Sequence, residues 1–220
     1  MNNKVVFTCN VGGYDNSPIP PSWAGWDKVL FTDNIINQHK GWTKVIEIEK
    51  TDRPDLIAKK YKWLIHQYLP DYDLFLWFDS NMKLIGIPPP PKPFRIIHHK
   101  RNSVTQEAKA LNDQQHRWKI ESVNEQVSYF KEDGFPDNQG LFLNGFFCRE
   151  NSLIENEISE YIYNIMTQFT SRDMLALPYV LWKLNYKYDK SVLKSIVFFN
   201  KFVRMSNHNI KKPPIYGSAN

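Results

Sequence analysis

The sequence predicts an α/β fold, a single domain in which a mostly parallel central sheet is flanked by helices. The run L-F-L-W-F at residues 74–78 has no polar alternation, which is typical of a strand buried on both faces of a parallel sheet. Other strand-like segments and segments of helical periodicity are interspersed along the chain. With 220 residues, 42% of them hydrophobic, the chain can bury one core and is short for two. We therefore expect one domain over residues 1–220.

The first half of the chain reads as three strands, a helix and a fourth strand. The predicted strands are 4–10, 28–32, 43–48 and 74–78. Pro54 suits the first turn of a helix, and apolar residues recur at helical spacing from there until Pro70. Lys59 and Lys62 share the polar face of this helix, where they either meet solvent or look into a site.

The second half is predicted to contribute two more strands and four helices. The expected elements are a strand at 94–98 after a stiff proline-rich connector, a helix starting from a capping box at 103–106, a helix around 123–130, a strand at 141–147, and helices at 154–169 and 170–183. Gly145 in the strand at 141–147 allows another backbone segment to approach closely. Pro178 is expected to bend the last helix.

Charge and composition narrow the class of protein. A net charge of +5 is too small to indicate nucleic-acid binding, but no acidic residue follows Asp189, so the positive field is C-terminal. Such a tail attracts a diphosphate, an acidic polymer or a membrane surface, or is simply solvated. We find neither a membrane span nor a signal segment. Cys9 and Cys148 lie in apolar segments, which favours buried thiols and a reducing compartment. Without a signal or membrane segment in this chain we expect a cytoplasmic location, with a Golgi-anchored one as the alternative.

Asp79-Ser80-Asn81 directly follows the predicted buried strand and has two interpretations. In open α/β sheets, ligands bind outside the carboxyl ends of the strands, so a carboxylate at this point can meet a metal ion or a ribose hydroxyl. Asp, Ser and Asn are equally common in ordinary turns. The tripeptide by itself favours neither interpretation.

Six blocks of sequence, taken in order, resemble a known class of enzymes. They are V-F-T-C-N-V-G-G-Y-D (6–15), F-T-D (31–33), A-K-K-Y-K (58–62), D-Y-D-L-F-L-W-F-D-S-N-M (71–82), G-L-F-L-N-G (140–145) and S-R-D-M-L-A-L-P-Y-V-L-W-K (171–183). The set is similar to GT-A-fold nucleotide-sugar glycosyltransferases, and among these it resembles a hexosyltransferase-like family related to the glycogenin-like enzymes. The likeness implies a Rossmann-like domain, a nucleoside diphosphate sugar donor and a divalent cation.

The resemblance also implies a donor and metal site. Asp79 and Asn81 stand where that superfamily has an Asp-x-Asp motif, with the neutral Asn81 replacing a second carboxylate. In the tail at 206–220, His208 corresponds to a metal-ligating histidine, and Lys211 or Lys212 to a lysine that contacts the diphosphate, so the tail is expected to close over the donor site. Imidazole favours Mn²⁺ over Mg²⁺ as the cofactor. A histidine in a polar tail is otherwise most often exposed.

Further positions correspond to donor-binding and catalytic residues of the same enzymes. Gly13, Tyr14 and Asp15 resemble a loop that binds the nucleotide base; Asp33 corresponds to a contact with the base or ribose; and Lys59 and Lys62 match basic positions that face the donor. Arg172 and Asp173 resemble the segment that approaches the sugar from the acceptor side, where Asp173 acts as a general base or orients the sugar. Alternatively, Thr170 and Asp173 have the spacing of a helix cap.

The function expected from these parts is transfer of a hexose from a nucleoside diphosphate sugar, a UDP-sugar by preference, to a hydroxyl of a glycan or glycoprotein. A sugar nucleotidyltransferase is one alternative, although the loop at residues 10–15 lacks the arginine that such enzymes ordinarily carry. A non-catalytic glycan- or nucleotide-binding module with a basic docking tail is another. The sequence does not choose between inversion and retention of the anomeric configuration.

Overall fold

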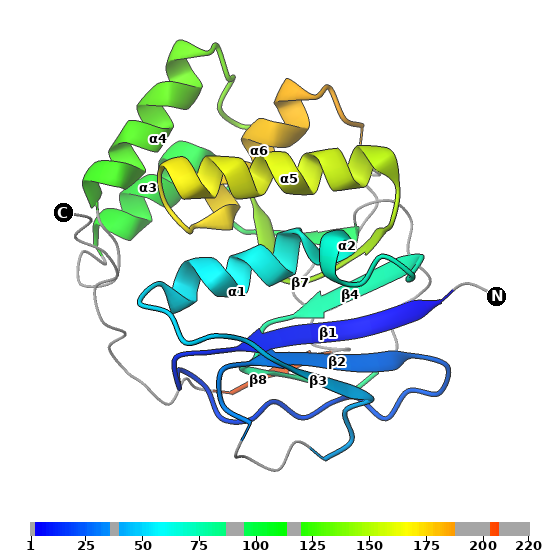
Figure 1. Ribbon diagram of the computed structural model, residues 1–220. Coiled ribbons are helices and arrows are strands. Elements are labelled where there is room, and N and C mark those ends of the chain that lie inside the picture. Colours follow the sequence, from blue (N-terminus) through cyan, green and yellow to red (C-terminus); the bar gives the residue numbers. More distant parts are fainter. Residues whose placement is uncertain (1–2, 36–39, 87–94, 114–119, 188–202, 207–220) are drawn as a thin grey trace.

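A six-stranded sheet in the order β3-β2-β1-β4-β7-β6 carries the candidate site. The computed structural model describes residues 3–35, 40–86, 95–113, 120–187 and 203–206 (Figure 1). The strands are β1 (Lys4–Asn10), β2 (Asp27–Thr32), β3 (Lys44–Glu47), β4 (Leu74–Phe78), β5 (Met82–Leu84), β6 (Arg95–His98), β7 (Phe142–Glu150) and β8 (Val203–Met205). The helices are α1 (Pro54–Trp63), α2 (Ile65–Tyr68), α3 (Val104–Asn112), α4 (Ile120–Glu132), α5 (Leu153–Gln168) and α6 (Asp173–Lys183).

Strand direction places several carboxyl ends at one edge of the sheet. β3, β2, β1 and β4 are parallel, β7 is antiparallel to β4, and β6 is antiparallel to β7, so β6 runs in the same direction as β4. The prediction of a mostly parallel sheet is confirmed. The ends of β1, β2, β4 and β6 therefore lie on the same edge, which is where open α/β sheets bind their ligands.

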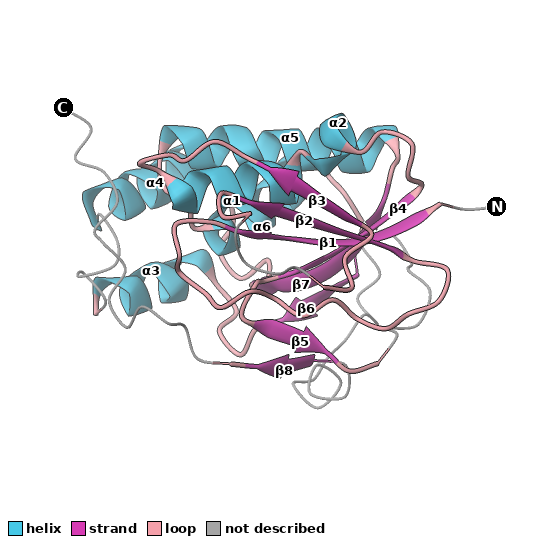
Figure 2. Cartoon of the chain, turned by 60° about the horizontal axis from the view of Figure 1, so that its bottom comes forward, coloured by secondary structure: helices cyan, strands magenta, loops and turns pink. Residues whose placement is uncertain are grey.

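The two faces of the sheet are covered differently. α1, α2, α5 and α6 lie on one face, and the small β5–β8 ribbon lies on the other (Figure 2). The larger hydrophobic cluster, with Phe75, Phe147 and Leu177, lies on the helical face. The smaller cluster, with Trp23, Phe78 and Met82, fills the space beneath the ribbon. Since apolar side chains pack against both faces, every residue of β4 is buried, as its unbroken apolar sequence predicted.

Local signals in the sequence account for most element boundaries. α1 begins at Pro54 as expected, but the helix predicted to run to Pro70 is interrupted at Leu64, where α1 ends and α2 follows. The N-cap predicted at Ser103 is confirmed, because Ser103 Oγ accepts a hydrogen bond of 3.1 Å from Gln106 N, while Gln106 Oε1 accepts from Asn102 N at 3.0 Å, one residue before the partner expected in a capping box. Pro178 lies inside α6 as predicted. The connector at 88–93 lies outside the described residues.

Both cysteines are free and buried, as their apolar surroundings indicated. Burial, reinforced by the charge of Asp33, raises the pKa of the Cys9 thiol, which keeps it protonated and unreactive. In the part of the chain that the structure describes, no helix combines the length and apolarity needed to cross a bilayer.

Candidate functional site

Asp79 lies immediately beyond β4, at the edge of the sheet where the parallel strands end. Its backbone N–H donates to Gly145 O at 2.7 Å, which continues the pairing of β4 with β7. The side-chain oxygen Oδ1 accepts a hydrogen bond of 2.8 Å from Trp77 Nε1. The side chain is 41% exposed, so this oriented carboxylate remains open to a ligand.

The loop after β1 packs against the ends of β2 and β4. Gly12 and Gly13 both have positive φ values, 68° and 63°, which glycine adopts without strain. Gly12 N donates to Asp33 Oδ2 at 2.9 Å, and Ser80 Oγ donates to Asp15 Oδ2. These contacts bring three of the predicted donor-site residues, Gly13, Asp15 and Asp33, to the carboxyl edge beside Asp79.

Tyr14 is half-buried in the same loop. Asn10 Nδ2 donates to the carbonyl oxygens of Asp15 and Asn16 at 3.3 and 3.1 Å, so the loop is tied back to the strand that it leaves. A loop held in this way presents its backbone and side chains in one arrangement, which is a requirement for selective ligand binding.

Asn81 is buried and connects the turn after β4 to the C-terminal part of the chain. Its carbonyl oxygen accepts hydrogen bonds of 2.8 Å from both Ser206 N and Ser206 Oγ, while its Nδ2 donates to Ser206 O at 3.3 Å. Ser206, the last residue that the structure describes, therefore lies next to this turn. His208, Lys211 and Lys212 lie outside the described residues.

Asp173, at the start of α6, is paired with two lysines of α1. Its Oδ2 lies 2.9 Å from Lys59 Nζ and 2.7 Å from Lys62 Nζ, and accepts a hydrogen bond of 3.2 Å from Trp63 Nε1. Burial would raise the pKa of this carboxyl, but the two ammonium groups outweigh burial and hold the pKa well below its usual value. Asp173 is therefore a buried carboxylate that is ionised at neutral pH.

Lys62 is enclosed by an aromatic cage formed by the rings of Trp63, Trp77 and Phe147, whose centroids lie 5.4–5.7 Å from Nζ. The side chain is only 1% exposed, and burial lowers its pKa to about 8 although Asp173 opposes the shift. Lys62 Nζ also lies 3.9 Å from Asp79 Oδ1. The lysine thus links the buried Asp173 to the exposed Asp79, and the polar face of the helix looks inward rather than toward solvent.

Lys59 differs from Lys62 in that its side chain is 23% exposed. Burial opposes its charge, but Asp173 and Asp79 outweigh burial and raise the pKa of the ammonium group. Lys59 therefore stays protonated and reaches the open side of the cluster formed by Lys59, Lys62, Asp79 and Asp173.

The capping interpretation of Asp173 is wrong. α6 has Arg172 as its N-cap residue, without a side-chain cap, and Thr170 Oγ1 accepts from Arg172 N at 2.9 Å. The carboxylate of Asp173 bonds instead to side chains of α1, as described above. Arg172 turns to the opposite side, where its Nε and a terminal N–H bond to Glu107 Oε1 at 3.0 and 2.8 Å.

Two neighbouring residues of β7 complete the edge. A Cβ atom on Gly145 would lie 2.8 Å from Asp79 Oδ2 and 2.5 Å from Met82 Cε, so a close approach occurs at this glycine, but by side chains and not by the backbone segment that was expected. Asn144 is 2% exposed, and its amide oxygen and nitrogen have no hydrogen-bond partner among the described residues. The sequence analysis did not select Asn144, although a polar amide inside an apolar strand indicates a buried group that needs a hydrogen-bond partner.

A cation would find one well-placed protein ligand here. Among the described ranges, which end at Ser206, no group of three or more His, Cys, Asp or Glu side chains could hold a metal ion. Asp79, directly after β4, offers a carboxylate whose side chain is 41% exposed. This sparse set fits Mg²⁺ or Mn²⁺ held by one or two carboxylates, water and substrate phosphates, and does not fit an all-protein metal cage.

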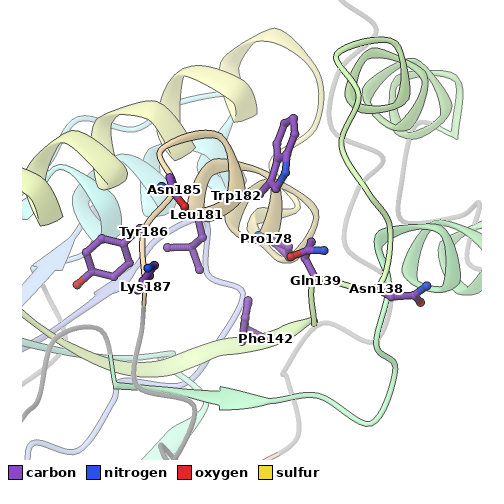
Figure 3. Close-up of a pocket in the computed structure, with 9 residues that line it drawn as sticks. All are labelled: Asn138, Gln139, Phe142, Pro178, Leu181, Trp182, Asn185, Tyr186 and Lys187. Carbon is purple, nitrogen blue, oxygen red and sulfur yellow. The ribbon is translucent and has the colours of Figure 1, made fainter.

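A cavity of about 510 Å³ lies away from these residues, between α6 and β7 (Figure 3). Its lining consists of Asn138, Gln139, Phe142, Pro178, Leu181, Trp182, Asn185, Tyr186 and Lys187. None of the residues predicted from the sequence to form the site lines this cavity.

Comparison with known proteins gives one result that bears on the site. The family model described as TOD1/MUCI70, glycosyltransferase-like domain, matches residues 34–208. The matched region contains Lys59, Lys62, Asp79 and Asp173, and it starts directly after Asp33. No curated protein shows significant similarity to the chain.

Proposed function

Because the chain belongs to the family of TOD1/MUCI70 glycosyltransferase-like domains, we propose that it transfers a hexose from a nucleoside diphosphate sugar, a UDP-sugar by preference, to a hydroxyl group of a glycan. The observation that carries the proposal is the charged cluster of Lys59, Lys62, Asp79 and Asp173. It joins an exposed carboxylate at a strand end to a buried carboxylate on α6.

The donor is proposed to lie over the ends of β1 and β4. The chemical problem is to neutralise two phosphates so that the nucleoside diphosphate can leave. A cation held by Asp79 would supply that neutralisation, as oxygen-bound divalent ions do in other phosphate sites. The loop at residues 12–15 would contact the base, and Asp33, which already fixes Gly12, would contact the ribose or base.

The tail supplies the remaining donor ligands in this proposal. Asn81 provides no second carboxylate, so the cation needs another protein ligand or more water. Ser206 is bonded to Asn81, which places the end of the described chain beside the turn. We assign His208 to the cation, with Mn²⁺ preferred. Lys211 or Lys212 is assigned to the diphosphate.

The electrostatics divide the roles of the α1 and α6 side chains. An efficient general base has a pKa near the working pH, whereas the pKa of Asp173 is held far below it. Asp173 is therefore assigned an orienting role and not that of a general base. Lys62 is too deeply buried to touch a donor. Lys59, partly exposed and hydrogen-bonded to Asp173 at 2.9 Å, is the cation that meets the departing phosphate or a sugar hydroxyl.

The test is calorimetric titration of a panel of nucleotide sugars, with and without Mn²⁺. It compares the wild type with Asp79→Ala and with the control Asp71→Ala, which removes an exposed carboxylate before β4. We expect one UDP-sugar to bind only with Mn²⁺, to lose that binding in Asp79→Ala and to keep it in Asp71→Ala. Release of UDP on adding acceptor then measures turnover.

Two results would contradict the proposal. If no nucleotide sugar binds under either condition, the donor site does not exist as described. If a donor binds but is neither transferred nor hydrolysed with any acceptor, the chain is a binding module.

A further inference from the structure

A pair of arginines flanks the candidate site on the side away from Asp79. Arg101 follows β6, and Arg172 precedes Asp173. The fully buried Glu107 of α3 joins them: its Oε2 lies 2.7 Å from a terminal guanidinium nitrogen of Arg101, and its Oε1 lies 2.8 Å from one of Arg172. We call Arg101 and Arg172, as joined by Glu107, the arginine pair.

We propose that the arginine pair binds an anionic group, a carboxylate or a phosphate, carried by the acceptor glycan. The inference rests on the proposed function, because it names the class of acceptor for the same site. Two guanidinium groups contact the single carboxylate of Glu107. A guanidinium fork matches the oxygens of a carboxylate or phosphate, which makes a paired set of forks selective for such groups.

The position of the arginine pair favours the acceptor over the donor. β6 lies two strands from β4, about 10 Å away at the usual strand spacing, and ends at the same edge, and Arg101 follows β6. The start of α6 lies between α1 and α3: Asp173 turns to α1, and Arg172 turns to α3. A donor bound over β1 and β4 therefore has the arginine pair on its far side, beyond Asp173.

The arginine pair is both held in place and accessible. Arg101 N donates to His99 Nδ1 at 3.0 Å, and Val104 N donates to Asp137 Oδ1 at 3.0 Å, so the loop between β6 and α3 is fixed at both ends. The side chains of Arg101 and Arg172 are 30% and 28% exposed. Glu107 thus fixes one edge of each guanidinium while part of each side chain meets solvent. Such preorganisation reduces the entropy lost on binding.

A purely structural role, in which the arginine pair only neutralises Glu107, would not require two arginines. One arginine is enough to neutralise a buried carboxylate, and breaking a buried pair is what costs stability. The second arginine adds positive charge at the mouth of the site, beside a helix that starts at Asp173.

The experiment uses three acceptor disaccharides that differ in one sugar unit. This unit is a hexuronic acid, the neutral methyl ester of that acid, or a hexose phosphate. Their binding to the full chain is measured by calorimetry without donor, so the result does not depend on donor chemistry. Hydrogen bonds to charged groups imply that the acid binds about 10- to 100-fold more tightly than the ester. The tighter of acid and phosphate identifies the natural anion. Equal binding of acid and ester overturns the inference.

Variants locate the effect. Arg101→Gln is expected to abolish the preference for the acid over the ester, while Arg101→Lys, which keeps the charge but loses the fork, retains part of it. The control Lys183→Gln removes a cation of similar exposure at the far end of α6 and should change nothing. A preference that survives in Arg101→Gln would overturn the assignment.

The result can be separated from the fate of the proposed function. If the wild type binds a UDP-sugar with Mn²⁺ but does not distinguish acid from ester, only the acceptor inference fails. If Arg101→Gln weakens UDP-sugar binding and leaves acid binding intact, the arginine pair serves the donor and the inference is wrong.

Discussion

Replacing Asp173 by Asn should destabilise the protein in a way that depends strongly on pH. The wild-type carboxylate offsets the charge of Lys62, which is only 1% exposed. Removing one partner of a buried ion pair typically costs about 3–5 kcal/mol. The amide introduced by the substitution can still accept from Trp63 Nε1, and Lys59 can turn to solvent, so the loss arises chiefly at Lys62.

The pH dependence follows from the pKa of Lys62. Burial lowers that pKa from 10.5 to about 8 in the wild type, and loss of Asp173 lowers it further. A lysine with a lowered folded pKa makes stability rise with pH, because the unfolded chain still binds the proton. Between the variant's pKa and pH 8, the penalty of the variant therefore falls by about 1.4 kcal/mol per pH unit. Above pH 8 to 9, Lys62 is neutral in both proteins and the penalty levels off.

The assay is urea unfolding followed by tryptophan fluorescence at pH 6, 7, 8 and 8.5, without metal or nucleotide. The difference between variant and wild type should shrink by up to about 2.7 kcal/mol from pH 6 to pH 8. In the control Asp133→Asn, which breaks the more exposed pair with Lys183, we expect a small loss of stability that does not change with pH. The double variant Asp173→Asn, Lys62→Met should lose the pH dependence, since methionine suits the aromatic cage. A penalty that is equal at pH 6 and pH 8.5 would refute the reasoning.

Three further changes test the donor side. Gly145→Ala should lower nucleotide-sugar affinity at least about tenfold in calorimetry and cost about 1–3 kcal/mol in urea unfolding, because its Cβ would press on Asp79 Oδ2 and Met82 Cε; unchanged affinity would mean that Asp79 is not confined as described. Ser80→Ala removes the hydrogen bond to Asp15 in the loop that is proposed to bind the base, and should weaken donor binding several-fold at a stability cost of about 1 kcal/mol. Lys59→Met should reduce kcat by about 100-fold with a smaller effect on KM, and wild-type turnover would remove Lys59 from the site.

Much of the fold was predictable because its signals are local. The apolar run of β4, the proline that opens α1 and the N-cap at Ser103 each depend on a few consecutive residues, and each is found as expected. The interruption of the helix at Leu64 was not predicted, because the apolar spacing continues through it.

The candidate site was predictable only in its parts. Asp79 could be identified because a carboxylate directly after a buried strand is a local feature with a known place in α/β sheets. For Lys59 and Lys62, the helical spacing left open whether they face solvent or a site. Glu107 was overlooked, since a glutamate in the first turn of a helix ordinarily needs no partner beyond the helix dipole.

By itself, the sequence determined where the six strands of the main sheet and most of the helices lie, that β4 is buried on both faces, and which polar residues stand at strand ends, but not the β5–β8 ribbon. Those properties follow from periodicity and chain stereochemistry over short segments. Only the tertiary structure decided that Asp173 meets Lys59, 114 residues away, and that Lys62 is sealed between the two carboxylates of the cluster. Which distant charges become neighbours, and how much water each loses, depends on how helices pack across the sheet, and no local pattern carries that information.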